Sequence, residues 1–329
     1  MSIPVLAAAS TSRLPGIDIL RFLAALSVTW RHSHEDPSLY HYHSLFTWTV
    51  PFFAAMVTYW MINHFRRNPD ESFVSYFKKR LTRIAIPFYA WSILYFLARN
   101  VERLWITHKE LLPFEWKHLW TGPTHHLWFL PFVILYSLVV FFPLQYANTR
   151  VRIKILLSLF VIPLGLLLAL TPNPYPPENY LPHQVWRTFP PALWTIPLAY
   201  FLPRIPATIQ KHLRWAGLLL LVLIFSTRLT PESTVLSNTI LAIVLVFTAA
   251  LPWQYPILAK LSPLGRLSYG IYLIHLFFII AMRLICRKFI GMAPGFDVTI
   301  ITFLGAAILS TLTVYLLTRH PLTRWLIPA

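Results

Sequence analysis

The chain has 329 residues, of which 57% are hydrophobic and only 12% charged, and its mean hydropathy is +0.58. This composition excludes an ordinary soluble domain and is typical of a polytopic membrane protein. The excess of 28 Lys and Arg over 11 Asp and Glu would suggest nucleic-acid binding in a soluble chain. In a membrane protein it reflects basic cytoplasmic loops, so we expect no nucleic-acid partner. The single cysteine, Cys286, excludes an internal disulfide and a cysteine-based metal cluster.

Apolar stretches long enough to span a membrane recur along the whole chain, which predicts an all-α integral membrane protein with a single domain over residues 1–329. With a cytoplasmic N-terminus, most Lys and Arg residues fall on cytoplasmic loops, so we expect both termini to be cytoplasmic. About ten transmembrane helices are expected, near residues 15–33, 45–64, 84–99, 126–146, 152–170, 188–203, 214–228, 235–252, 267–285 and 298–318.

The first of these helices, "DILRFLAALSVTWRH", carries charge that hydrocarbon does not tolerate easily. Arg21 and His32 differ by only about 20° around a helix and by about 16 Å along it, so they share one face. Asp18 lies one turn before Arg21 and can pair with it. The stripe is either a polar track through the interior of the bundle or an ion pair that joins helices, with a histidine at the membrane interface.

The segment "FKKRLTRIAIPF" places Arg80 and Arg83 on one face at the start of the third helix. Arginine forks bind phosphate oxygens in pairs, so these residues could clamp a polyphosphorylated cytosolic ligand such as coenzyme A or a nucleotide. The alternative is that their charge only sets the membrane topology. The sequence has no Gly-rich phosphate loop, which argues against a nucleotide-hydrolysing enzyme.

Polar side chains also occur in two later helices. "THHLWFLPF" places His126 and Trp128 at the outer end of the fourth helix, the same side as His32, unless they form only an interfacial belt. "LSYGIYLIH" places Ser268, Tyr272 and His275 on about one face of the ninth helix, where a histidine in the membrane implies a partner or a cavity. "HSHEDPSLYHYH" has several possible metal ligands, but its spacing matches no standard pattern, and we expect no metal.

Four motifs, in this order, resemble the integral-membrane acyltransferase family 3, whose members O-acylate glycans. "IDILRFLAALSVTWRH" resembles that family's first-helix pattern of Arg, ten residues and His, and "RLTR" resembles its Arg-two-residues-Arg motif. "HHLWFL" and "LSYGIYLIH" resemble its fourth-helix and ninth-helix signatures. Two features depart from the family pattern. The second helix reads "VPFFAAMVTYWM" without a Ser-Gly pair, and a Glu-Arg-Pro-like ending is "RHP" here.

The resemblance implies a stand-alone member without an appended soluble domain. It implies a membrane-bound O-acyltransferase that moves an acyl group, most often acetyl, from cytosolic acyl-CoA to a hydroxyl of a cell-surface or lipid-linked glycan, in the inner membrane of a bacterium. His32 would be the catalytic base, with Arg21 and Asp18 beside it, and Arg80 and Arg83 would bind the donor. The alternatives are a non-enzymatic transporter of a lipid-linked glycan or anion and a structural or sensory membrane protein.

Overall fold

The computed structural model of the chain describes residues 14–34, 46–106, 109–175, 180–227, 234–253 and 255–327, and these contain helices and no strand. The helices are α1 (Pro15–Ser33), α3 (Thr49–Arg67), α4 (Phe73–Arg80), α5 (Ile86–Val101), α6 (His118–Thr121), α7 (Phe129–Thr149), α8 (Val151–Leu170), α9 (Tyr180–Phe201), α10 (Ala207–Thr227), α11 (Val235–Ala250), α12 (Pro256–Leu261), α13 (Ser268–Leu284) and α14 (Phe296–Arg319). Short 3₁₀ and π-helical turns extend several of them, namely η3 (Leu81–Ala85), η4 (Glu102–Ile106), η5 (Leu202–Arg204), η6 (Ser262–Leu267) and η7 (Ile285–Phe289).

Each predicted apolar segment overlaps a long helix of the described residues. Six continuous helical stretches in this part of the chain are long and apolar enough to cross a membrane. They are Phe73–Leu104, Phe129–Thr149, Val151–Leu170, Ala207–Ser226, Pro256–Phe289 and Phe296–Arg319. Helix α1, which carries three charged side chains and a histidine, is not among the six. It instead packs against α3, α11, α13 and α14, so other helices cover much of its surface.

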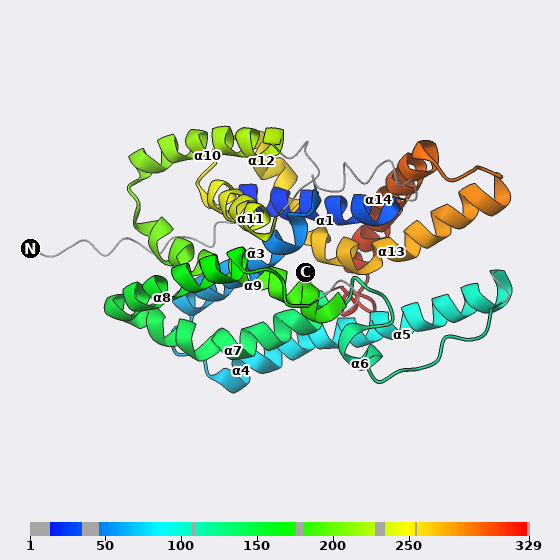
Figure 1. Cartoon of the computed structure of the whole chain (residues 1–329), viewed down its shortest axis with the longest axis horizontal. Coiled ribbons are helices and arrows are strands. Elements are labelled where there is room, and N and C mark those ends of the chain that lie inside the picture. Colours follow the sequence, from blue (N-terminus) through cyan, green and yellow to red (C-terminus); the bar gives the residue numbers. More distant parts are fainter. Residues whose placement is uncertain are drawn as a thin grey trace, which may run out of the picture.

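Helix α1 therefore has a central position in the bundle. In Figure 1 it runs beside α11 and α13, while α10 lies at the periphery and packs on α11. Helix α3 contacts α1 and α11 and also packs against α7 and α9, and the long α4–α5 helix lies beside α7. Close approach of α13 and α14 depends on Gly270, because a Cβ atom at this position would lie only 2.6 Å from Val314 Cγ1.

Several helices extend beyond the apolar segments that predicted them. The third predicted span was placed at 84–99, but the helix begins at Phe73 and continues through the basic segment. Helix α9 begins at Tyr180 rather than near residue 188, although it contains Pro190, Pro191 and Pro197. The apolar stretch marks only what can lie in hydrocarbon, and helical hydrogen bonding continues into the charged ends.

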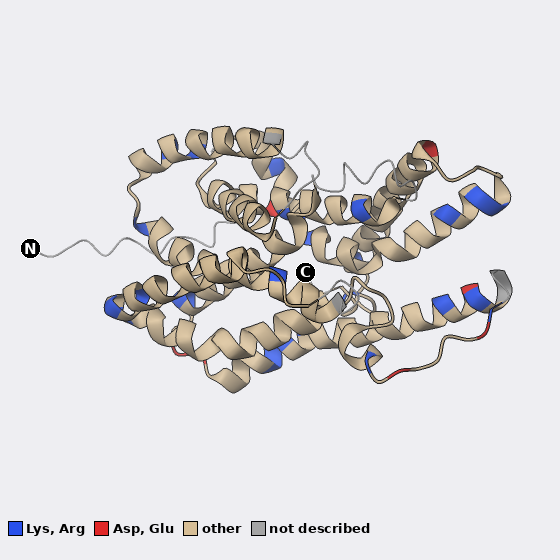
Figure 2. Ribbon diagram, in the orientation of Figure 1, with Lys and Arg blue, Asp and Glu red and all other residues tan. Residues whose placement is uncertain are grey.

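The outer faces of the long helices are apolar. On α8, Leu159 and Phe160 are each 63% exposed, and on α10 the exposed residues include Leu219 and Val222. Exposed apolar faces along whole helices are typical of contact with lipid rather than water. Charge is sparse on the ribbon, and Lys and Arg outnumber Asp and Glu (Figure 2).

Candidate functional site

A cavity of about 570 Å³ lies between α3, α4, η3, α7 and α13 and reaches α1. Its volume is in the usual range for small-molecule sites. The basic lining residues are Arg21, His64, Arg67, Lys79, Arg80 and Arg83. No Asp or Glu is among the lining residues in the described part of the chain. The remaining wall is largely aromatic and aliphatic, and includes Phe53, Trp60, Phe129 and Tyr272. Such a cavity suits a ligand that has both anionic groups and an apolar arm.

The ion pair in α1 borders this cavity. Arg21 Nη1 lies 3.6 Å from Asp18 Oδ1, and the arginine lines the cavity. Asp18 is buried and also accepts a hydrogen bond of 2.9 Å from Ser262 Oγ. Gly265 allows this contact, because a Cβ atom there would lie 2.5 Å from the Asp18 carbonyl oxygen. The turn before α13 therefore fixes Asp18, and Asp18 in turn orients Arg21.

Arg80 and Arg83 both line the cavity, on a helix that changes its geometry between them. Arg80 Nε donates to Tyr76 Oη at 2.9 Å, and its guanidinium lies 5.2 Å from the centre of the Tyr76 ring. Arg83 is part of the π-helical turn η3, in which Ile86 N–H bonds to Leu81 O. Pro87 explains this turn, because a proline has no N–H for the Arg83 carbonyl and its ring clashes with that carbonyl.

Three histidines from distant parts of the sequence form a cluster. The ring centres of His32 and His275 are 5.3 Å apart, those of His126 and His275 are 5.0 Å apart, and those of His32 and His126 are 6.4 Å apart. His126 and His275 are buried, and His32 is partly exposed. Tyr95 packs on the His126 ring at 5.1 Å, and its hydroxyl donates to Leu273 O at 2.8 Å.

Hydrogen bonds define which nitrogen of His275 carries the proton. Nδ1 lies 2.8 Å from Tyr272 O and 3.2 Å from Ile271 O. A carbonyl oxygen can only accept, so Nδ1 is the donor and the neutral ring presents a lone pair on Nε2. Nε2 is buried and has no hydrogen-bond partner among the described residues. His275 can therefore accept a proton or a hydrogen bond inside the cluster.

Tyr272 joins the histidine cluster to the cavity. Its side chain lines the cavity, and its hydroxyl donates to the His126 carbonyl oxygen. The Tyr272 ring lies 5.7 Å from the ring of His126 and 6.2 Å from that of His275. Ser268 also lines the cavity and donates to Gly265 O at 2.8 Å. Trp128 packs on Phe129 and Phe132, and like His32, His126 and His275 it is not among the residues that line the cavity.

The end of α1 that carries His32 is held by an arginine from α13. Arg283 Nη2 donates to the carbonyl oxygens of His32 at 2.7 Å and of His34 at 3.0 Å. The His32 carbonyl belongs to the last turn of α1 and the His34 carbonyl to the residue that follows the helix, where no helical N–H is available to satisfy them. Arg283 thus fixes the backbone that positions the His32 ring.

The structure also assigns neighbours that the sequence did not indicate. His64, Arg67 and Lys79 line the cavity, and Tyr95 packs on the histidine cluster. Of these residues, only Lys79 lies in the segment that the sequence had singled out, beside Arg80. Within the described ranges no group of three His, Cys, Asp or Glu side chains is arranged to hold a metal ion. Most of the histidine-rich segment falls in residues 35–45, outside these ranges.

Comparison with known families places the chain in a family. The model of a family described as an acyltransferase domain matches residues 14–319, nearly the whole chain. Comparisons with curated proteins and with solved structures found no significant match. The match includes all the residues of the cavity and the histidine cluster.

Proposed function

The chain belongs to acyltransferase family 3, and from this premise we propose that it transfers an acyl group, most simply acetyl, from cytosolic acyl-CoA to a hydroxyl of a cell-surface or lipid-linked glycan. It is a multi-pass membrane protein and an acyltransferase. The donor, the acceptor, about ten spans with both termini cytoplasmic, and a bacterial inner membrane belong to the proposal. The family match favours an enzyme over the non-enzymatic transporter.

The single observation that carries the proposal is a continuous arrangement of residues. One cavity is lined by Arg80 and Arg83, by Arg21 and by Tyr272, and Tyr272 packs against the histidine cluster. Coenzyme A has anionic phosphates and a thin, uncharged pantetheine arm. Its phosphates would bind the arginine pair, and the arm would pass along the aromatic wall toward the histidines.

His32 would act as the general base. Its imidazole takes the proton of the sugar hydroxyl while that oxygen attacks the thioester carbonyl carbon. The C–S bond then breaks, the new ester forms, and the imidazolium returns the proton to the departing thiolate. The Nε2 lone pair of His275 would accept a hydrogen bond from the protonated ring of His32 or from the bound hydroxyl. An acyl-histidine intermediate is the alternative route.

The proposal is tested with full-length protein in nanodiscs, supplied with acetyl-CoA labelled in the acetyl group and a lipid-linked glycan fraction. We expect free thiol to appear together with label on the glycan, and mass spectrometry should show one added acetyl mass. Movement of glycan across the bilayer without thiol release would contradict the proposed chemistry and support the transporter.

A further inference from the structure

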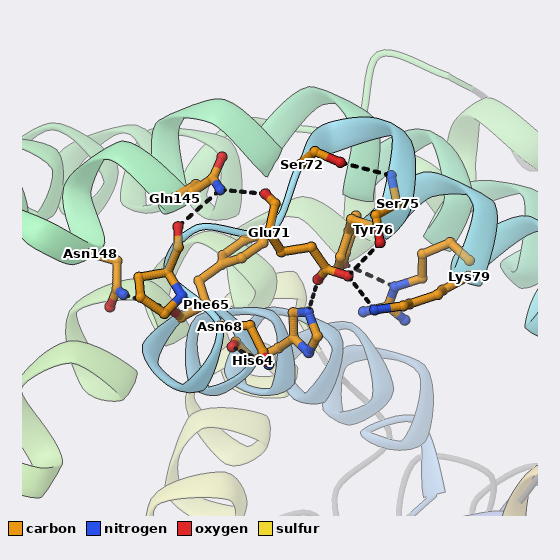
Figure 3. Close-up of polar contacts among 12 residues, drawn as sticks. His64, Phe65, Asn68, Glu71, Ser72, Ser75, Tyr76, Lys79, Gln145 and Asn148 are labelled. Carbon is orange, nitrogen blue, oxygen red and sulfur yellow. Dashed lines mark hydrogen bonds and ion pairs between the residues drawn. The ribbon is translucent and has the colours of Figure 1, made fainter.

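A buried carboxylate lies just behind the basic wall of the cavity. Glu71, in the turn between α3 and α4, accepts hydrogen bonds from His64 and Lys79 on its two carboxylate oxygens, and Ser75 Oγ adds a third at 3.1 Å (Figure 3). Only 6% of its side chain is exposed. Glu71 does not line the cavity, whereas both His64 and Lys79 do. The carboxylate therefore holds two cavity-lining side chains from outside the cavity.

The backbone around Glu71 is also fixed. Gln145 on α7 donates from Nε2 to the Glu71 carbonyl oxygen at 2.7 Å, and Ser72 Oγ caps α4 by accepting from Ser75 N–H (Figure 3). Burial raises the pKa of the Glu71 carboxyl, but the hydrogen bonds from Lys79, His64 and Ser75 outweigh it and lower the pKa to about 2. Glu71 is therefore a fixed negative charge at neutral pH.

The cavity therefore has two sets of basic side chains that are oriented in different ways. The first set is Arg80 and Arg83, and Tyr76 orients Arg80 independently of Glu71. The second set is Lys79, His64 and Arg67. Glu71 orients Lys79 and His64, and Arg67 follows His64 on the last turn of α3. An ammonium group has three donors, so the bond to Glu71 leaves Lys79 two for a ligand. A donor with two separate anionic groups could be bound by both sets.

We propose that Lys79, which Glu71 orients, and Arg67, at the end of α3, form a second anion site in the cavity. This site takes a phosphate monoester, the ribose 3′-phosphate of coenzyme A, apart from the diphosphate at Arg80 and Arg83. This inference rests on the proposed donor. A monoester carries close to two negative charges at neutral pH, which suits two cations from facing helices. Glu71 is a positioning residue in this site and touches no ligand.

The test compares binding of coenzyme A with that of dephospho-coenzyme A, which differs only in lacking the 3′-phosphate, to full-length protein in nanodiscs. We expect wild type to bind dephospho-coenzyme A about ten- to a hundredfold more weakly, since charge-assisted contacts are worth about 1.5–3 kcal/mol. Lys79→Met and Arg67→Met should each weaken coenzyme A binding and bring the ratio of the two dissociation constants toward one. Neither should change binding of dephospho-coenzyme A.

Three further variants separate this site from its surroundings. Arg80→Met should weaken both ligands and keep the ratio. Glu71→Gln should lower the ratio, whereas general damage to the fold would weaken both ligands equally. Lys78→Met is the matched control, because Lys78 is exposed and does not line the cavity, and it should behave as wild type.

A wild-type ratio near one, with acyl-CoA still consumed, would overturn the second anion site and leave the proposed function standing. An unchanged ratio in both Lys79→Met and Arg67→Met would overturn it as well. Failure of wild type to bind either ligand would contradict the donor assignment, and the second site with it.

Discussion

The ring of His275 lies 5.3 Å from the ring of His32, although the two residues come from α13 and α1. If they work as a unit, removing one should cost nearly as much as removing both. We expect His275→Ala and His32→Ala to lower kcat, and the double variant to lose little more than His32→Ala alone. The check is a double-mutant cycle on acyl transfer, normalised to folded protein. Multiplicative losses would show that the two histidines act independently.

Arg80→Ala and Arg83→Ala should each raise the KM for acyl-CoA while changing kcat much less. Each charge-assisted contact to phosphate is worth about 1.5–3 kcal/mol, or roughly ten- to a hundredfold in affinity. Lysine at either position should restore binding only in part, because the planar fork is lost. Initial-rate kinetics over a range of donor concentration provide the measurement. Normal donor affinity in both alanine variants would contradict phosphate binding by Arg80 and Arg83.

Arg21→Gln should reduce both folding and activity, because it removes the ion pair of the buried Asp18 and leaves it, among the described residues, the hydrogen bond from Ser262. Breaking a buried pair from one side costs about 3–5 kcal/mol, and the 28% exposure of the Arg21 side chain places the loss toward or below the lower end. Adding Asp18→Asn should recover thermal stability but not activity. Melting in detergent checks this, and a double variant less stable than Arg21→Gln would contradict the pairing.

Glu71 should make stability depend on pH at acidic values. Its pKa is lowered from 4.5 to about 2 in the folded protein, so its stabilising contribution is complete above about 4.5 and is lost as pH falls toward about 2. Glu71→Gln should therefore melt below wild type at pH 7, by about 2–4 °C for each kcal/mol lost. The difference should shrink between about pH 5 and pH 3. A constant difference over this range would contradict the charged role of Glu71.

The sequence was sufficient to predict much of the helical framework, because a membrane span appears in the sequence as a continuous run of apolar residues. The Asp18–Arg21 pair also follows from spacing within one helix, and the structure has it at 3.6 Å. Helix ends were less predictable. The third span begins well before residue 84 because hydrogen bonding, unlike hydropathy, continues through charged residues.

Contacts between helices could not be predicted from the sequence. Nothing local indicates that His126 lies beside His275, or that Glu71 links α3 to α4, since helix packing decides both. The aromatic environment of Trp128 was equally hidden. Its packing on Phe129 and Phe132 depends on how the aromatic rings of this segment fold together, which the sequence motif does not state.

The most direct test of the central claim is glycan acylation by His32→Ala, normalised to membrane protein level and compared with His212→Ala, a variant of an exposed histidine on α10 outside the cavity. A general base contributes roughly 10²–10⁴-fold to rate, so His32→Ala should lose at least about a hundredfold while folding and donor binding persist. His32→Gln should lose as much, and His212→Ala should match wild type. A normalised yield near wild type in His32→Ala would exclude His32 as the catalytic base.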